Sequence, residues 1–173
     1  SMHMFTPQGG FYGGHGIVGA QAPLGAGFGF ANKYRANDRV SVTYFGDGAA
    51  NQGQVFEAFS RAALRKLPLI FVIENNQYAM GTSIARSTAI QELGRRGEAF
   101  GIPGRQVDGM DVVAVQAAAA EAVRSGELRR IHRGAPTHDS LPPALSLSLS
   151  LSLSPSPSLS LSPPRGPTPL LTS

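Results

Sequence analysis

The feature that most limits the fold of this chain is an apolar run that follows a helix-like segment and an earlier strand-like segment. Residues 69–73, Leu-Ile-Phe-Val-Ile, are all apolar, as in a parallel strand that is covered on both faces. Residues 39–45 are rich in β-branched and aromatic side chains and end at Gly46, which is typical of another strand. Between them, residues 52–66 place apolar side chains at three- and four-residue spacing, which predicts a helix. The segment therefore predicts a right-handed βαβ unit of an α/β fold with a central parallel sheet flanked by helices.

Helices are also expected on either side of this unit. Residues 17–34 are rich in Ala and Gly and predict a closely packed helix, although Gly has a low helix propensity. Residues 83–99 read as a polar connection with some helix. Residues 111–124 predict a helix with Asp111 as its N-cap and Gly126 as its stop.

The composition changes after Gly126. Residues 134–173 are dominated by Ser, Leu and Pro, and residues 145–154 alternate Leu and Ser strictly. Alternation is the period of a strand, but nothing else in this region predicts a sheet, and proline-rich low complexity is typical of disorder. We therefore predict a folded domain over residues 1–126 and a disordered C-terminal tail over residues 127–173.

Each strand of the predicted βαβ unit is followed by a polar motif. The first is Gly-Asp-Gly-Ala-Ala-Asn at residues 46–51, and the second is Glu-Asn-Asn-Gln-Tyr at residues 74–78. Either motif alone is common in turns, but the carboxyl ends of neighbouring parallel strands meet at the edge where α/β sheets bind ligands. The motifs supply carboxylate, amide and carbonyl oxygens, which Mg²⁺ combines with phosphate and water. Free N–H groups at the start of the following helix also favour phosphate. Together the motifs predict a site for a metal-bound diphosphate.

Composition argues against several other classes of function. The chain contains no cysteine, so a disulfide or a thiolate metal site is excluded. A formal net charge of +4 could suit nucleic acid, but the Arg95-Arg96 and Arg129-Arg130 doublets are isolated and typical of solvated surfaces. No apolar run reaches the roughly eighteen residues of a membrane span, and the first residues show no signal or transit peptide. Residues 14–19 match G-x-G-x-x-G, but no strand precedes them, so nicotinamide binding is the least favoured alternative.

The spacing of Gly-Asp-Gly and Asn-Asn resembles the thiamin-diphosphate signature. Similarity to the alpha-subunit family of the pyruvate dehydrogenase decarboxylating component extends over residues 1–126 and is carried by the following segments: 1–4, 11–21, 44–54, 74–83, 101–104 and 107–111. The resemblance implies a partial thiamin-diphosphate-binding fold. It also implies oxidative decarboxylation of pyruvate with acetyl transfer to a lipoyl group.

The same resemblance implies thiamin diphosphate and Mg²⁺ as cofactors. Asp47, the side chain of Asn76 and the backbone carbonyl of Tyr78 correspond to metal ligands in the family. Gly48 and Ala49 correspond to the residues whose backbone N–H groups bind the diphosphate.

A second set of contacts is implied for the aminopyrimidine ring of the cofactor, which Gly16 and Val18 approach in the family. No catalytic residue is assigned to this chain, because the glutamate that activates the aminopyrimidine belongs to the partner subunit.

The resemblance further implies assembly with a beta subunit in a heterotetramer and with the lipoyl-bearing dihydrolipoyl acetyltransferase. The compartment would be the mitochondrial matrix, or the cytoplasm if the protein is bacterial. Two alternatives stay open: a catalytically incompetent fragment of such a subunit, and the alpha subunit of a related acetoin or branched-chain 2-oxoacid dehydrogenase.

Overall fold

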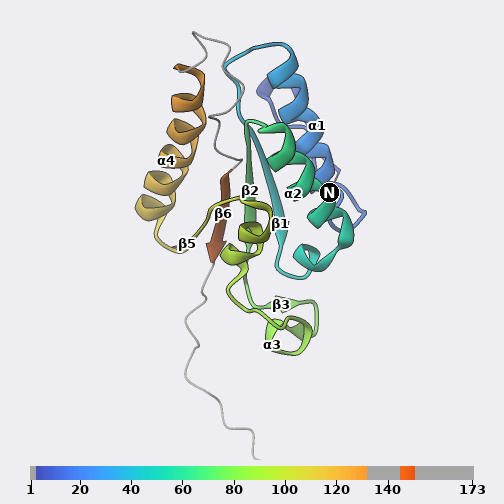
Figure 1. Ribbon diagram of the computed structural model, residues 1–173. Coiled ribbons are helices and arrows are strands. Elements are labelled where there is room, and N and C mark those ends of the chain that lie inside the picture. The colour runs from blue at the N-terminus through green and yellow to red at the C-terminus, as the bar shows by residue number, and fades with distance from the viewer. Residues whose placement is uncertain (1–2, 132–144, 151–173) are drawn as a thin grey trace, which may run out of the picture.

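The computed structural model describes residues 3–131 and 145–150, which form a four-stranded sheet with helices on both faces and a separate two-stranded sheet (Figure 1). The elements follow in this order: η1 (Pro7–Gly9), α1 (Gln21–Tyr34), β1 (Ser41–Gly46), η2 (Ala49–Asn51), α2 (Gly53–Arg65), β2 (Leu69–Glu74), β3 (Tyr78–Ala79), β4 (Thr82–Ser83), α3 (Ile84–Ser87), η3 (Leu93–Phe100), β5 (Gly104–Asp108), α4 (Val112–Ile131) and β6 (Leu145–Ser150). Within these residues, no helix is both long and apolar enough to cross a bilayer.

The predicted βαβ unit is present. Strands β1 and β2 pair in parallel, in a register that runs from Ser41 opposite Leu69 to Gly46 opposite Glu74. Helix α2 connects the two strands. The residue that follows the helix, Lys66, has a left-handed conformation with a φ of 50°. This conformation ends the helix just before the turn into β2.

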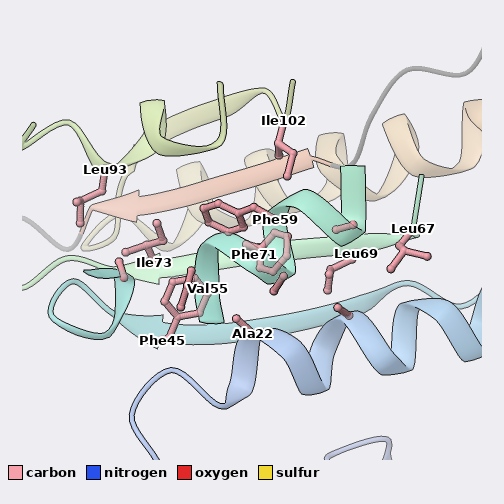
Figure 2. Packing of buried hydrophobic residues seen from close by; sticks show 14 of the residues in the cluster. Ala22, Phe45, Val55, Phe59, Leu67, Leu69, Phe71, Ile73, Leu93 and Ile102 are labelled. Atoms are coloured by element: carbon pink, nitrogen blue, oxygen red, sulfur yellow. The ribbon is translucent and has the colours of Figure 1, made fainter. Parts of the chain in front are cut away.

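Strand β2 is buried on both faces, as its continuous apolar sequence predicts. Leu69, Phe71 and Ile73 belong to a core with helices α1 and α2, whereas Ile70 and Val72 belong to a second core with helix α4. Figure 2 shows the first core, where Phe59 of α2 meets Phe71 edge to face with ring centroids 4.6 Å apart. The alternating side chains of one strand therefore join the helices of the two layers.

Helix α1 begins at Gln21 rather than at residue 17 as predicted. Gly19 has a φ of 81°, a left-handed conformation through which a right-handed helix does not run. Once started, the helix packs closely on β1: a Cβ at Gly25 would lie 2.7 Å from the Cβ of Thr43. The small residues of α1 thus serve close packing, as the sequence indicates.

Helix α4 confirms its predicted start and corrects its predicted end. The Asp111 carboxylate accepts hydrogen bonds from the backbone N–H groups of Val113 and Ala114, at 2.9 and 3.1 Å, so Asp111 is the N-cap. The helix then continues through Gly126 to Ile131. A single interior glycine costs only about 1 kcal/mol relative to alanine, and residues 127–131 include good helix formers such as Glu, Leu and Arg.

Residues 145–150 form strand β6 in the structure, within the segment that the sequence predicts to be disordered. Strand β6 lies between β2 and β5 and is parallel to both, in the sheet order β1-β2-β6-β5. The alternating sequence has the period of a strand, and β2 and β5 each provide an edge for it to pair with. This pairing is long-range, so local composition could not reveal it. Strand β5 itself was not predicted, and the remainder of the proposed tail, residues 132–144 and 151–173, lies outside the described residues.

The division of the chain at residue 126 stays a prediction. Helix α4 crosses that point, and β6 lies in the same sheet as β1 and β2.

Candidate functional site

The two polar motifs lie side by side at the carboxyl ends of β1 and β2. Gly46 is in register with Glu74, and the next backbone N–H, that of Asp47, donates to the carbonyl of Glu74 at 3.2 Å. This bond extends the ladder of the sheet one residue into the loop. Asp47 is only 4% exposed, although β1 lies at the edge of the sheet. A buried carboxylate is stabilised by a cation or by hydrogen bonds.

The 74–78 segment is shaped by two consecutive turns, in each of which an asparagine side chain bonds the backbone two residues on. Asn75 Oδ1 accepts from the N–H of Gln77, and Asn76 Oδ1 accepts from the N–H of Tyr78, both at 3.0 Å. Asn75 is buried and has a structural role, whereas Asn76 is exposed. Because an amide oxygen has two lone pairs, Asn76 keeps one for a ligand.

Residues 47–51, which we call the Asp47 loop, also lie against the short strand β3. A Cβ built on Gly48 would be only 2.4 Å from the Cβ of Ala79. The loop therefore approaches β3 closely, and Gly48 lies next to the residue that follows Tyr78. Asp47, Asn76 and Tyr78 consequently come from two neighbouring strand ends and one adjoining turn.

The oxygen donors at this edge suit Mg²⁺ better than metals that prefer nitrogen or sulfur. Among the described residues, no cluster of three or more His, Cys, Asp or Glu side chains could hold a metal ion. One carboxylate, one amide and one backbone carbonyl leave several positions of an octahedron for phosphate and water, as is usual for Mg²⁺. The donors therefore fit a metal that arrives with a diphosphate.

The Asp47 loop is also held by Arg96, a residue that the sequence analysis assigned to a solvated surface. Its Nη1 donates to the carbonyl of Ala50 and its Nη2 to Asn51 Oδ1, each at 2.6 Å. Nη2 also lies 3.4 Å from Thr88 Oγ1. Burial lowers the pKa of Arg96, and the negative charge of Asp47 opposes that shift. The interpretation of this half of the arginine doublet was wrong.

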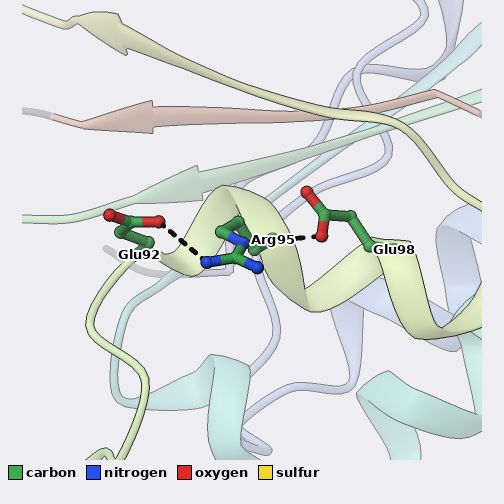
Figure 3. Close-up of polar contacts among 3 residues, drawn as sticks. All are labelled: Glu92, Arg95 and Glu98. Atoms are coloured by element: carbon green, nitrogen blue, oxygen red, sulfur yellow. Dashed lines mark hydrogen bonds and ion pairs between the residues drawn. The ribbon is translucent and has the colours of Figure 1, made fainter.

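The other half, Arg95, is on the surface as expected. It pairs with Glu92 and with Glu98, each at 3.5 Å, one turn before and one turn after it (Figure 3). All three side chains are more than half exposed. These carboxylates raise the pKa of Arg95.

A signal for this difference is present in the sequence. Arg96 lies three residues after Leu93 and four residues before Phe100, and both of these pack against the core. Arg95 instead has a glutamate three residues before it and another three residues after it. The periodicity of η3 could therefore have shown that Arg96 faces inward.

Gly16 and Val18 lie on a separate, exposed loop before α1. The carbonyl of Val18 accepts a hydrogen bond from Gln54 Nε2 at 2.6 Å, and a Cβ on Gly19 would lie 3.1 Å from Gln52 Cβ. This loop is thus attached to the first turn of α2, which directly follows the Asp47 loop. Among residues 3–131, no hydrogen bond joins Gly16 or Val18 to Asp47 itself, and their contact with an aminopyrimidine stays a prediction.

Comparison with known proteins places these residues in a family. Residues 1–129 match the family described as dehydrogenase E1 component. The chain belongs to this family. This confirms the resemblance over the N-terminal part of the sequence.

The relatives of this E1 chain share a name. It is 65% identical to the pyruvate dehydrogenase E1 component subunit alpha of Rhizobium meliloti over 130 residues, which is 73% of this chain and 37% of the relative. It is 63% identical to that of Zymomonas mobilis over 71% of this chain and 35% of the relative. It is 55% identical to the mitochondrial somatic form from Pan troglodytes, over 73% of this chain and 32% of the relative. The chain thus spans about a third of the length of these relatives.

A solved structure shows the same fold. A thiamin diphosphate-dependent enzyme from Mycobacterium smegmatis superposes with a TM-score of 0.58 at 20% identity, over 81% of this chain and 23% of that one. The expected class, a partial α/β fold of the thiamin-diphosphate-binding type with a central parallel sheet, is confirmed.

Proposed function

We propose that this chain acts as part of the alpha subunit of a thiamin-diphosphate-dependent pyruvate dehydrogenase. The reaction is oxidative decarboxylation of pyruvate with transfer of the acetyl group to a lipoyl group. The observation that carries the proposal is the buried carboxylate of Asp47, which lies beside the 74–78 segment within the part of the chain that matches the E1 family. The names of the relatives favour pyruvate over acetoin or branched-chain 2-oxoacids.

The residues at the strand ends would hold thiamin diphosphate together with Mg²⁺. Asp47, the amide oxygen of Asn76 and the carbonyl of Tyr78 would ligate the metal, and the N–H groups of Gly48 and Ala49 would bind the diphosphate. The close approach of Gly48 to Ala79 supports this assignment, because it brings the backbone of the Asp47 loop next to the turn that carries Tyr78.

When bound, thiamin diphosphate supplies the nucleophile and the electron sink that decarboxylation requires. The role of this chain is to bind and orient. Asp47 would offset part of the charge of the metal. Gly16 and Val18, attached to α2 through Gln54, would pack against the aminopyrimidine ring.

The remaining groups would come from partners. We propose a heterotetramer with a beta subunit, whose glutamate would activate the aminopyrimidine, and docking of a lipoyl-bearing dihydrolipoyl acetyltransferase. Bacterial and mitochondrial relatives both exist, so the compartment would be the cytoplasm in the first case and the mitochondrial matrix in the second.

A chimera tests the proposal in a full-length context. Residues 1–129 would replace the corresponding segment of the Rhizobium meliloti alpha subunit, and the product would be coexpressed with the beta subunit of that organism. We expect turnover of pyruvate that exceeds turnover of branched-chain 2-oxoacids and of acetoin. The 173-residue chain alone is expected to show no turnover.

The intact relative with the same beta subunit is the control. A chimera that folds and assembles but shows no turnover, while the control is active, would favour the incompetent-fragment alternative. Preference for acetoin or for a branched-chain 2-oxoacid would reassign the substrate.

A further inference from the structure

We infer that Arg96 is a positioning residue that holds the Asp47 loop in the conformation needed for ligand binding. The inference rests on the proposed function of that loop. The Asp47 loop has little backbone hydrogen bonding of its own, because residues 47–51 lie between the end of β1 and the first turn of α2. The backbone bonds within the loop and at its end are those from Asn51 N–H to the carbonyl of Gly48, at 3.2 Å, and from Gln52 N–H to the carbonyl of Ala49, at 3.0 Å.

The guanidinium of Arg96 crosses from η3 to two consecutive residues of this loop. Its two terminal nitrogens bond the Ala50 carbonyl and the Asn51 side chain, each at 2.6 Å. Hydrogen bonds from a charged donor are short and stronger than neutral ones, and the rigid fork of arginine fixes two acceptors relative to each other.

A buried hydroxyl completes the arrangement. Thr88 is 9% exposed, and its Oγ1 lies 3.2 Å from Asn51 Nδ2 and 3.4 Å from Arg96 Nη2. The side chain of Asn51 is therefore held from both of its ends, by Arg96 at the oxygen and by Thr88 at the nitrogen.

The support behind Arg96 is itself rigid. Leu93 and Gly97 of η3 are buried, and a Cβ on Gly97 would lie 2.8 Å from the carbonyl oxygen of Ile102. Since the backbone of η3 is packed this closely, the core fixes the point from which the Arg96 side chain reaches the loop.

The charges allow Arg96 to act without competing for the ligand. The hydrogen bonds of Arg96 in the described residues go to Ala50, Asn51 and Thr88, whereas its interaction with Asp47 is electrostatic. The carboxylate of Asp47 therefore keeps its oxygens available for a cation.

Amide hydrogen exchange on the 173-residue chain tests the inference without any cofactor. The variant is Arg96→Gln, and the matched control is Arg95→Gln, which removes the neighbouring arginine from the surface. We expect exchange of the Asn51 and Gln52 amides to rise about tenfold or more in Arg96→Gln, the ratio that corresponds to about 1.4 kcal/mol. The amides of Phe71 and Val72 should be unchanged. In Arg96→Lys, which keeps the charge but loses the forked guanidinium, the exchange rates of Asn51 and Gln52 should lie between those of Arg96→Gln and Arg95→Gln.

Unchanged exchange at Asn51 and Gln52 would overturn the inference. So would an equal rise at Phe71 and Val72, because Arg96 would then support the whole fold and not the loop. A second measurement titrates thiamin diphosphate with Mg²⁺ into the chimera with the beta subunit, and we expect Arg96→Gln to bind about tenfold more weakly, or worse, than Arg95→Gln. If the chimera with neither substitution fails to bind, the proposed function is contradicted, whereas the exchange result on the 173-residue chain still decides the role of Arg96 in the loop.

Discussion

At the scale of single residues, the site depends on a close approach between the Asp47 loop and strand β3. Gly48 shows this most clearly. Its φ and ψ of −65° and −42° are open to any residue, so its need for glycine is not conformational. The need comes from Ala79, whose Cβ occupies the space that a side chain at position 48 would take.

Replacing Gly48 with alanine should therefore separate steric crowding from backbone strain. We expect Gly48→Ala to destabilise the chain by about 1–3 kcal/mol, as overpacked sites do, and to weaken binding of Mg²⁺ with thiamin diphosphate. Gly53→Ala is the control, since a Cβ there meets nothing within 4 Å. Urea unfolding of both variants is the measurement. Equal stability of the two would show that the loop and β3 separate easily.

Residues also show where sequence reasoning succeeds and where it fails. Asp47 and the 74–78 segment could be placed together because parallel strands fix which loops meet. Arg96 was missed because a charged doublet in a loop-rich region does not by itself show which member faces inward. Only the spacing along η3, with Leu93 three residues before Arg96 and Phe100 four residues after it, distinguishes Arg96 from Arg95.

At the scale of elements, helix α1 shows that glycine can have two different effects within one helix. Gly25 faces β1 at a distance that leaves no room for a methyl group, since its Cβ would be 2.7 Å from that of Thr43. Gly27 lies on the exposed side, and a Cβ there meets nothing within 4 Å. The first glycine sets the distance between helix and strand, and the second only lowers helix propensity.

Alanine at these two positions should have effects of opposite sign. We expect Gly27→Ala to stabilise the chain by about 0.5–1 kcal/mol, the difference in helix propensity. Gly25→Ala should destabilise it by about 1–3 kcal/mol, because α1 must move away from Thr43. Thermal or urea unfolding of both variants measures this. A stabilising Gly25→Ala would mean that α1 is not packed on β1 as described.

At the scale of the whole molecule, the sheet depends on a segment whose sequence looked least able to fold. Strand β5 has β6 as its only partner among the described strands, and β6 joins it to β2. The βαβ unit was predictable because its pattern is local. The place of β6 was not, because it pairs with strands that precede it by about 40 to 75 residues.

Amide exchange across Leu145–Ser150 tests this pairing. We expect protection of these amides that is comparable with that of Ile70 to Val72 in β2, since a strand with neighbours on both sides has its backbone groups bonded. Exchange at the rate of an unfolded chain would contradict the pairing and would return this segment to the disordered tail that its composition predicts.

The central claim is that the Asp47 loop and the 74–78 segment form one site for a metal-bound diphosphate. The most direct test is calorimetric titration of thiamin diphosphate, with and without Mg²⁺, into the chimera with the beta subunit, carrying either Asp47→Ala or Glu57→Gln. Glu57 is exposed on α2, so its variant removes a negative charge away from the site. We expect Mg²⁺-dependent affinity to persist in Glu57→Gln and to fall at least about tenfold in Asp47→Ala, because a charge-assisted contact is worth about 1.5–3 kcal/mol. Equal affinity in the two variants would contradict the claim.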